Sequence, residues 1–520
     1  MSVLKRIHVT LFFVAILSGC GSLPNEIEHT NESVSAPLSS SLSELSASFQ
    51  AVPSTAETSA VLLQDSGWDA LAQRLALIEI AEHSIDIQYY IWNSDASGHY
   101  LASRLLAAAD RGVKVRVMLD DINLNEREDL LVALNAHPQV EIRVFNPIPT
   151  RRGVTKWVNF LGDFSRLNRR MHNKSFTVDG VFSIVGGRNI GDEYFDLSNE
   201  INFRDRDVLV RGSVVRDIQT SFIEYWDSRW SYPVDLLAEE ASSEALSQKN
   251  VSQEQPVLDE IDAPVYKNYP ALPEGNKTAH QYLTNLMDKM TWVNAKFVFD
   301  RPVPLDKDNT DEPKETAKAL GKLASESKKE ILLESAYLIF DDNQLKGWQA
   351  LINTGVEIKA LTNSMASNDL TTNHSGYAGR RQDMLEHGIQ LYELKPETEL
   401  CEESTKDVSK CAPTLPYGLH AKSAVFDDNI ASIGSFNFNL RSTYLNTESI
   451  LIIENQKIAD QLTQDIEHAM DEENSWHLKL QEGDVRWYSG DKSWESEPET
   501  GRWERFQSGF LQLLPIEKYL

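Results

Sequence analysis

The amino-acid sequence predicts an α/β protein with an internal duplication, because a strand-helix-strand unit and a polar motif each occur twice. The first unit follows the helical stretch "DALAQRLALIEIAEHS" and consists of "SIDIQYYIW", "YLASRLLAAADRG" and "VKVRVMLDD". The second unit repeats this order as "KEILLESAYLIF", "NQLKGWQALINTG" and "VEIKALTNS". Gly112 and Gly355 stand at the matching helix ends, where glycine readily takes the left-handed conformation that ends a helix.

The polar motif places a histidine and a lysine two residues apart, so both side chains project from the same side of a strand. An aspartate follows in a turn, and a second turn entered by a glycine leads to an asparagine. The two copies are His172, Lys174, Asp179 and Asn189, and His420, Lys422, Asp427 and Asn437. His420 lies 248 residues after His172, and Thr354 lies 243 residues after Arg111, so the offset is nearly constant. By chance one copy should occur on the order of once in thirty such sequences, so two matched copies indicate duplication.

The chain divides into six predicted segments. They are a lipoprotein signal peptide (1–19), a disordered tether (20–60), a first domain (61–235), a connector with an insert (236–325), a second domain (326–483) and a C-terminal tail (484–520). The tether is rich in Ser, Thr, Glu and Pro and lacks sustained apolar periodicity. The tail ends in the apolar stretch "FQSGFLQLLPIEKYL", for which packing on the body is the default and contact with lipid the alternative.

The first twenty residues predict export. Lys5 and Arg6 precede an apolar stretch that is too short to span a bilayer comfortably, and small residues follow. The sequence Leu17-Ser18-Gly19-Cys20 resembles the bacterial lipobox, in which the cysteine is lipidated; an ordinary secretory signal with a chance cysteine is the alternative. Gly21, where retention in the inner membrane usually has aspartate, favours the outer membrane, facing the periplasm.

Charge and cysteine content narrow the classes of function. The 520 residues carry a formal net charge of -28, which disfavours binding to nucleic acid or to an anionic membrane over most of the surface. Any anionic substrate therefore needs a local basic site. Besides Cys20, only Cys401 and Cys411 are present, and an oxidising compartment favours a disulfide between them over two free thiols. A metal site there lacks histidines at ligand spacing.

Both polar motifs match the "HKD" motifs of the phospholipase D superfamily. The stretches "DFSRLNRRMHNKSFTVDG", "GGRNIGDEYF" and "GSFNFNLRSTYLNTE" further resemble the class C branch of bacterial cardiolipin synthases, from about Trp68 to the end of the chain. This resemblance implies two pseudo-twofold-related domains, each a mixed β-sheet flanked by helices, with one active site at their interface. The tether and the segment from Cys401 to Cys411 fall outside what that branch leads us to expect.

The motifs suit chemistry on a phosphodiester, whose negative oxygens repel nucleophiles unless fixed cations and donors surround the phosphorus. Lys174, Lys422, Asn189 and Asn437 would supply these groups. One histidine can attack phosphorus while the other protonates the departing oxygen, without a metal or another cofactor. The resemblance implies His172 as nucleophile and His420 as acid and then base, although pseudo-symmetry leaves the order open. Asp179 and Asp427 are expected to orient loops rather than react.

A carboxylate on the second ring nitrogen of each histidine would fix its tautomer. Glu448 matches the family position for this group, and Asp205 is the expected counterpart in the first half, with Asp207 as competitor. A surface charge is the alternative for each acid.

Lipid is favoured over nucleic acid as the substrate class. The basic cluster Arg151, Arg152, Lys156, Arg166, Arg169 and Arg170 lies among Trp157, Phe160, Leu161 and Phe164, a pattern typical of membrane interfaces; a solvated helix face is the alternative. Arg169, Arg170, Tyr377 and Arg380 are the candidate headgroup contacts. For Tyr377 and Arg380, core packing and a surface charge are the alternatives.

The resemblance implies transfer of a phosphatidyl group onto phosphatidylglycerol, with phosphatidylethanolamine as a possible donor. Water as acceptor would instead give a phospholipase D-type hydrolase that releases phosphatidic acid. Two further classes, a periplasmic nuclease and a non-catalytic envelope lipoprotein, stay open. The sequence also leaves open whether a partner protein is required.

Overall fold

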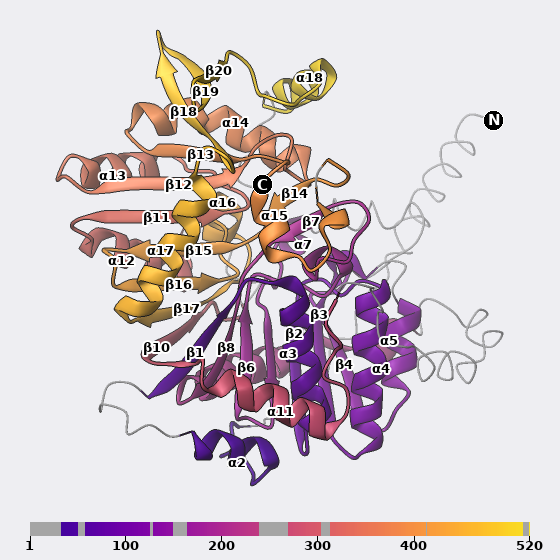
Figure 1. Cartoon of the computed structure of the whole chain (residues 1–520). Coiled ribbons are helices and arrows are strands. Elements are labelled where there is room, and N and C mark those ends of the chain that lie inside the picture. Colours follow the sequence, from indigo (N-terminus) through magenta and orange to yellow (C-terminus); the bar gives the residue numbers. More distant parts are fainter. Residues whose placement is uncertain are drawn as a thin grey trace, which may run out of the picture.

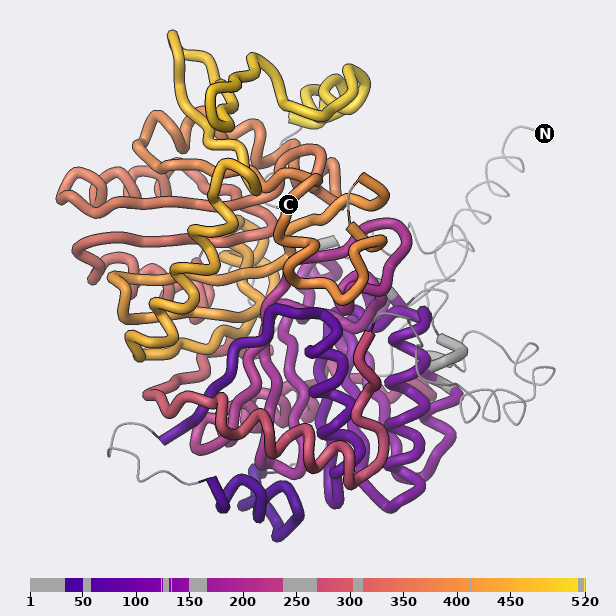
Figure 2. The backbone as a smooth tube through the Cα atoms, in the orientation of Figure 1, coloured from indigo at the N-terminus to yellow at the C-terminus, as the bar shows by residue number. Residues whose placement is uncertain are grey.

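A computed structural model describes residues 33–49, 58–124, 128–148, 164–238, 269–302, 312–411, 413–512 and 519 of the chain (Figure 1). Within this part of the chain the two halves lie side by side, the first drawn in indigo to magenta and the second in salmon to yellow (Figure 2). Each half contains a mixed sheet, and the two sheets join edge to edge into one sheet of 18 strands. This is the duplicated α/β architecture that the sequence predicts.

The sheet of the first half has two parallel pairs at its centre and antiparallel strands on both sides. Its strands, in spatial order, are β1 (Ser59–Gln64), β8 (Asp207–Gly212), β6 (Phe182–Gly186), β5 (Ser175–Val178), β2 (Ser84–Tyr89), β3 (Lys114–Asp120), β4 (Val140–Phe145) and β9 (Ser231–Pro233). The strand-helix-strand unit expected from the sequence is β2, α4 (Ala96–Asp110) and β3. Gly112 follows α4 with a φ of 95°, as its position at the helix end predicts.

The second half repeats this order of strands and extends it. Its strands are β10 (Thr291–Phe299), β17 (Ser449–Glu454), β16 (Ile430–Gly434), β15 (Lys422–Phe426), β11 (Glu330–Ser335), β12 (Glu357–Asn363), β13 (Gln390–Leu394), β18 (Ser475–Gln481), β19 (Asp484–Ser489) and β20 (Lys492–Trp494). The unit β11, α13 (Asp342–Ile352) and β12 matches the unit in the first half, and Gly355 after α13 has a φ of 99°.

Strand β10 corrects the predicted boundary between the halves. It pairs with β17 on one side and with β1 on the other, so it is the counterpart of β1 and joins the two sheets. The helix α12 (Glu315–Glu326) likewise stands before β11 as α3 (Gly67–Ile80) stands before β2. The second half therefore begins near Thr291 rather than at residue 326. The helix α11 (Asn276–Met287), also in the predicted connector, packs against α3.

Helices cover both faces of each sheet, since alternate side chains of one strand enter different cores. In β11, Ile331 and Leu333 belong to the core under α12 and α13, whereas Leu332 packs in the core with α17 (Gln456–Met470). In β3, Val117 packs under α3 and α4, whereas Met118 contacts the cluster of α8 (Val214–Trp226). The core around α17 also includes residues of β8 and α8, so it holds the two halves together.

The predicted tether contains a folded helix. In α2 (Ser41–Ser48), Leu42 and Leu45 lie three residues apart on one face and are buried against the first half, and Ser40 and Ser43 form a capping box. The carboxylate of Glu82 accepts hydrogen bonds from the backbone and hydroxyl of Ser41. The prediction of disorder across 20–60 is therefore wrong for this stretch, because two leucines in a Ser-rich segment suffice to anchor one short helix.

The C-terminal tail is packed on the second half. Strands β19 and β20 extend its sheet, and α18 (Arg502–Leu511) lies against α14 (Thr371–Glu386). Between them, the buried Glu497 accepts a hydrogen bond from Arg381 and pairs with His374, both in α14. None of the helices in the described ranges combines the length and apolar character that a membrane crossing requires.

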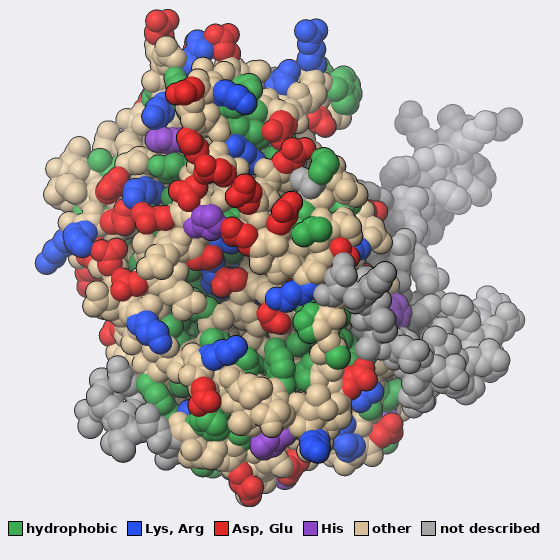
Figure 3. Space-filling view, viewed as in Figure 1, with side chains coloured by type: hydrophobic (Ala, Val, Ile, Leu, Met, Phe, Trp, Pro, Cys, Tyr) green, Lys and Arg blue, Asp and Glu red, His purple; other side chains and the backbone are tan. Residues whose placement is uncertain are grey.

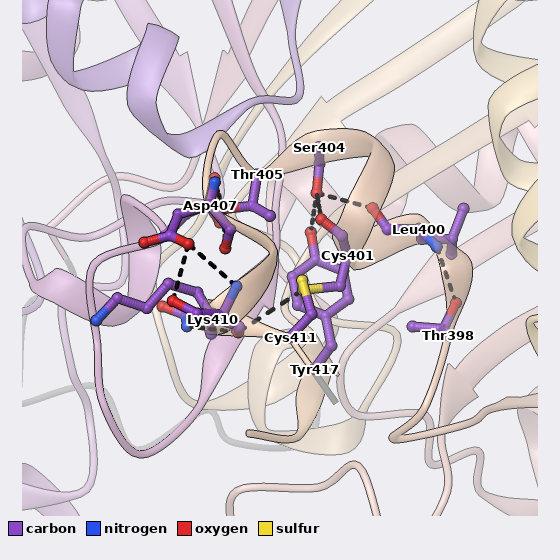
Figure 4. Close-up of a disulfide and its surroundings, with 12 residues drawn as sticks. Thr398, Leu400, Cys401, Ser404, Thr405, Asp407, Lys410, Cys411 and Tyr417 are labelled. Atoms are coloured by element: carbon purple, nitrogen blue, oxygen red, sulfur yellow. Dashed lines mark hydrogen bonds between the residues drawn. A yellow bond between two sulfur atoms is a disulfide. The ribbon is translucent and has the colours of Figure 1, made fainter. Parts of the chain in front are cut away.

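A disulfide joins Cys401, in α15 (Glu399–Ser404), to Cys411, just after the short helix η3 (Val408–Lys410) (Figure 4). Both cysteines are buried. Beside the bridge, the Lys410 ammonium donates to the backbone carbonyl of Leu197 at 3.1 Å and to the side chain of Asn199 at 2.5 Å. The disulfide loop of the second half thereby holds a loop of the first half.

Candidate active site

A cleft of about 710 Å³ lies between the two halves and contains both motif histidines. Its lining comes from both halves. The lining residues are Tyr90, Ile91, Asn93, Ile122, His172, Asn189, Glu193, Tyr194, Ser198, Glu200, Ile201 and Phe203 from the first half, and Tyr337, Asp369, Leu370, Thr372, Asn373, His420, Asn437, Asn439, Arg441, Ser442, Asn446 and Tyr519 from the second. The structure thus brings two motifs 248 residues apart into one site.

Backbone hydrogen bonds between the halves hold the two histidines in place. The His172 amide donates to the carbonyl of Thr447 at 2.9 Å, and the His420 amide donates to the carbonyl of Arg204 at 2.8 Å. The second contact continues a short parallel pairing between β7 (Asn202–Arg204) and β14 (Tyr417–Leu419). Each histidine is therefore positioned by the other half of the chain.

Each histidine also pairs with a carboxylate of the opposite half. Nδ1 of His172 lies 2.8 Å from a carboxylate oxygen of Glu448, and Nδ1 of His420 lies 2.5 Å from one of Asp205. The two acids occupy matching positions, since each lies two residues before the strand partner of the glycine that ends β6 or β16. With Nδ1 engaged, Nε2 is the ring nitrogen that each histidine can present to a substrate.

Burial sets the charge of these pairs. Burial and the Lys174 ammonium lower the pKa of His172 to about 4, and burial and the Lys422 ammonium lower the pKa of His420 to about 3. Although burial acts in the opposite direction, the neighbouring histidines lower the pKa of both Asp205 and Glu448. Both rings are therefore neutral and both acids ionised at neutral pH when no anion occupies the cleft.

The two motif lysines are buried beside the histidines. The Lys174 ammonium donates to the carbonyl of His172 at 2.6 Å and lies 5.4 Å from the centre of the Tyr90 ring, and the Lys422 ammonium donates to the carbonyl of His420. Burial lowers the pKa of Lys174 to about 7 and that of Lys422 to about 8. An anion in the cleft would restore their charge, because a nearby negative group stabilises an ammonium.

The motif asparagines differ in their contacts, although both line the cleft. The Asn189 amide donates to the hydroxyl of Tyr194 at 3.0 Å, and its oxygen accepts from the backbone of Ile91 at 3.2 Å. Among the described residues, the buried side-chain oxygen of Asn437 has no hydrogen-bond partner. The side chain of Asn437 is therefore held by fewer protein hydrogen bonds than that of Asn189.

The motif aspartates lie in turns and fix loops. Asp179 has a φ of 51° and its carboxylate accepts hydrogen bonds from the backbone amides of Glu82, His83 and Ser84. Asp427 has a φ of 52° and binds the amides of residues 328, 329 and 330 in the same way. Each aspartate joins the turn after a motif strand to the start of the neighbouring strand β2 or β11.

Several residues that support the site were not singled out from the sequence. Asp120 accepts the amide of Met171 at 2.8 Å, and Asn363 accepts the amide of Leu419 at 2.7 Å, so the residue before each histidine is fixed. Asp120 is the last residue of β3 and Asn363 is the last residue of the matching strand β12. This shared position in the two repeats is the sequence signal that could have identified them.

The surroundings of the two histidine pairs hold further residues of this kind. The rings of Tyr90 and Tyr194 lie edge-on to His172 and His420, and Ser435 and Ser442 donate to Glu448. Arg441 also lines the cleft, and no periodic pattern in the sequence identifies it as a site residue.

The structure places none of the four predicted headgroup contacts on the lining of the cleft. Arg170 is fully buried and donates to Asp120 and to two backbone carbonyls, and Arg169 is buried beside it. Tyr377 lies in the core of the second half, and Arg380 pairs with Asp342 and Asp383. These predictions are wrong because the sequence does not reveal which basic residues pair with an acid of the protein and which aromatic residues pack in a core. Cys20 and the cluster residues 151–163 lie outside the described residues.

The cleft is therefore lined by two neutral histidines and two amides, and the two carboxylates and the two motif lysines are buried beside the histidines. This set suits a phosphodiester, because one ring can attack phosphorus and the other can exchange a proton with the departing or entering oxygen. Within the described ranges, no group of three or more His, Cys, Asp and Glu side chains is arranged to hold a metal ion.

The family model described as "Cardiolipin synthase, PLD-like domain" matches residues 75–226 and 320–470. The chain is 35% identical over 460 residues to cardiolipin synthase C of Escherichia coli (strain K12), with 86% of this chain and 93% of that protein covered. It is 24% identical over 398 residues to a cardiolipin synthase of Geobacillus kaustophilus, with 76% of this chain and 62% of the relative covered. The crystal structure of phosphatidylserine synthase from Haemophilus influenzae Rd KW20 matches the fold with a TM-score of 0.56 at 13% identity, over 92% of this chain and 100% of that one.

Proposed function

Because the chain belongs to the phospholipase D-like cardiolipin synthase family, we propose that it joins a phosphatidyl group to phosphatidylglycerol and so makes cardiolipin. Membership in this family makes the chain a phospholipid-modifying phosphatidyltransferase. The observation that carries the proposal is the crossed arrangement of His172 with Glu448 and His420 with Asp205 in one cleft. That arrangement leaves Nε2 of both rings available, so that His172 can attack phosphorus and His420 can take up and give a proton.

In the first step, Nε2 of His172 forms a bond to phosphorus while the bond from phosphorus to the headgroup oxygen breaks. His420, which takes up a proton from water on Nε2 when the anionic phosphodiester binds, gives this proton to the departing oxygen, which leaves as an alcohol. The bound phosphodiester opposes the low pKa of His420, because its negative charge favours the protonated ring. Lys174, Lys422, Asn189 and Asn437 stabilise the charge that develops on the phosphate oxygens.

In the second step, a hydroxyl of phosphatidylglycerol gives its proton to His420 and forms a bond to phosphorus. The bond between phosphorus and His172 breaks, which regenerates the histidine and leaves cardiolipin. Glu448 keeps the proton on Nδ1 of His172 and stabilises the phosphorylated ring. Phosphatidylglycerol and phosphatidylethanolamine are the proposed donors.

Water in place of the lipid acceptor would make the same site a phospholipase D-type hydrolase that releases phosphatidic acid. The competition between the two acceptors depends on how far water is kept from phosphorus. A nuclease or a non-catalytic scaffold has weaker support, because nucleases need phosphate-binding surface along a polymer and a scaffold needs neither histidine pair.

We place the protein in the cell envelope, bound to a bacterial membrane through lipid on Cys20, with the outer membrane facing the periplasm as the proposed site. Export of this kind suits the disulfide between Cys401 and Cys411, since disulfides persist in oxidising compartments.

The proposal is tested by mass spectrometry of the lipids formed in vesicles of phosphatidylglycerol, with and without phosphatidylethanolamine. Cardiolipin should form with the wild type and disappear with His172→Ala and with His420→Ala. More cardiolipin in the presence of phosphatidylethanolamine would identify it as a donor. Phosphatidic acid without cardiolipin would indicate the hydrolase, and no change in any lipid would contradict both lipid activities.

The covalent intermediate is tested separately. The reaction is stopped at alkaline pH, and the peptide that contains His172 is examined for a phosphatidyl group. The expected adduct is absent from His172→Ala. An adduct on the peptide with His420 would reverse the roles of the two histidines.

A further inference from the structure

The helix α18 presents an aromatic face to solvent. Trp503, Phe506 and Phe510 are 67%, 62% and 59% exposed, and the rings of Trp503 and Phe506 stack with their centres 5.6 Å apart. Their spacing of three and four residues places them on one side of the helix. A surface helix that packs on its own domain normally turns such a side inward.

The opposite side of α18 faces the body. Ser508 is the buried residue of the helix, and α18 packs along α14. Gln512, which caps the helix, lies against Gly379 of α14, and the buried Glu497 fixes the chain just before the helix to α14. The aromatic side is therefore held outward by packing on the other side. At the end of the molecule where α18 lies, Figure 3 shows hydrophobic side chains beside basic ones at the surface.

The helix α18 lies close to the active-site cleft. Glu504 of α18 lines a second pocket together with Thr371 and His374 of α14, while the neighbouring residues Thr372 and Asn373 line the cleft. The first turn of α14 is thus the wall between α18 and the cleft. Leu370, just before that turn, is 46% exposed and also lines the cleft.

The end of the chain returns to the same cleft. Tyr519, eight residues after α18 ends at Leu511, lines the cleft, and its carbonyl accepts a hydrogen bond from Arg441 at 3.0 Å. Tyr519 and the first turn of α14, which α18 contacts, therefore both line the cleft.

We infer that Trp503, Phe506 and Phe510 form a docking surface that enters the interfacial region of a phospholipid bilayer and holds the mouth of the cleft against it. The inference rests on the proposed function only in that the cleft must receive a lipid from a membrane. Aromatic rings beside an arginine, as in Arg502-Trp503, suit the boundary between headgroups and acyl chains.

The net charge of the chain favours an apolar docking surface. At -28, the protein is repelled by an anionic bilayer over most of its surface, so attraction must come from a local patch. Three aromatic side chains gain by leaving water whatever the headgroup charge. A protein partner or a second copy would not explain why the helix that carries these aromatics packs on α14, whose first turn lines a cleft that takes a lipid.

Two measurements on the full chain test the inference. The first compares activity on vesicles of long-chain phosphatidylglycerol with activity on short-chain phosphatidylglycerol dissolved below its critical micelle concentration. Replacing the three aromatics with Gln should lower vesicle activity about tenfold or more and leave activity on the dissolved lipid within about twofold. Replacing all three with Leu should retain vesicle activity, and Val408→Gln, which removes another hydrophobic side chain of 62% exposure, should change neither.

The second measurement does not depend on turnover. Brominated phosphatidylglycerol in vesicles should quench part of the tryptophan fluorescence of the wild type, and Trp503→Phe should lose that part. Equal quenching in the two proteins would overturn the inference even if no lipid is converted, which separates it from a failure of the proposed function. Equal loss of both activities in the Gln variant would assign the face to folding and would overturn the inference. A dimer that forms with the wild type and not with the Gln variant would assign the face to a second copy and would also overturn it.

Discussion

Glu448 and Asp205 are the residues on which the reactivity of the two histidines depends. Each carboxylate binds Nδ1 of the histidine from the other half, so each leaves Nε2 in the reactive tautomer. We expect Glu448→Gln to lower kcat by about 10²–10⁴-fold with little change in KM, because the amide can stabilise the wrong tautomer. Steady-state kinetics on phosphatidylglycerol vesicles measures this, and an unchanged kcat would contradict the role of the pair.

Asp207→Asn is the matched control for Asp205→Asn. Asp207 is the competing candidate from the sequence, but its carboxylate pairs with the buried Arg74 at 2.8 Å instead of a histidine. We therefore expect Asp205→Asn to lose kcat by a similar factor of about 10²–10⁴ and Asp207→Asn to reduce stability more than kcat. Comparable losses of kcat at equal folded fraction would contradict this assignment.

The motif lysines make a prediction about pH. Burial lowers the pKa of Lys174 to about 7 and that of Lys422 to about 8, so in the free enzyme both are charged below these values and neutral above them. Since only the charged form attracts a phosphodiester, kcat/KM should fall as the pH rises through about 7 to 8. Measuring kcat/KM from about pH 5 to 10 tests this, and a constant value across that range would contradict it.

Lys174→Arg provides the comparison for that pH profile. Arginine stays charged throughout this range, so the fall above neutral pH should move to higher pH even if the maximal rate is lower. A profile identical to that of the wild type would show that Lys174 does not set the alkaline limb.

The disulfide loop stabilises the fold next to the cleft and supplies no catalytic residue of the proposed reaction. The bridge closes a loop of sequence separation 10, and Lys410 within it holds the loop of Leu197 and Asn199 beside the cleft. We expect Cys401→Ser with Cys411→Ser to lower the free energy of unfolding by about 3 kcal/mol. Urea denaturation with and without reductant measures this. The wild type should respond to reductant and the double variant should not.

Individual elements show where sequence patterns succeed. The apolar and alternating runs predict β2, β3, β11 and β12 correctly because these strands are central and buried. The short helix α2 escapes prediction because only Leu42 and Leu45 anchor it, and their burial depends on a surface that lies far along the chain. The place of β10 in the second half is equally hidden, because its pairing with both β1 and β17 is a property of the assembled sheet.

The whole molecule is held together by a buried ionic cluster between the halves. The Arg206 guanidinium of the first half binds Glu334 and Asp465 of the second half as well as Asp65. Arg206→Met should lower the free energy of unfolding by about 3 kcal/mol, because the buried Glu334 loses one of its two guanidinium partners and keeps only Arg204. Urea denaturation followed by far-UV circular dichroism measures the loss.

The double variant Arg206→Met with Glu334→Met is the control for that prediction. It removes a charge of each sign, so it should recover part of the stability that the single variant loses. If the double variant loses as much free energy of unfolding as the two single variants lose together, or more, the result would contradict a direct interaction between the two residues.

Local periodicity and a repeated spacing, both contained in the sequence, predict the duplicated α/β fold, the two sets of histidine, lysine and asparagine, and the loop-fixing aspartates. The two acids are expected from the resemblance to the phospholipase D superfamily, with Asp207 left open beside Asp205. The contacts of the folded chain show that Glu448 binds His172, that Asp205 binds His420 and that Asp207 pairs with Arg74. They also show that the predicted headgroup contacts are buried or paired elsewhere. Such assignments depend on contacts between segments that lie apart in the chain, which folding brings together within one half for Asp207 and Arg74 and between the halves for the two histidine pairs.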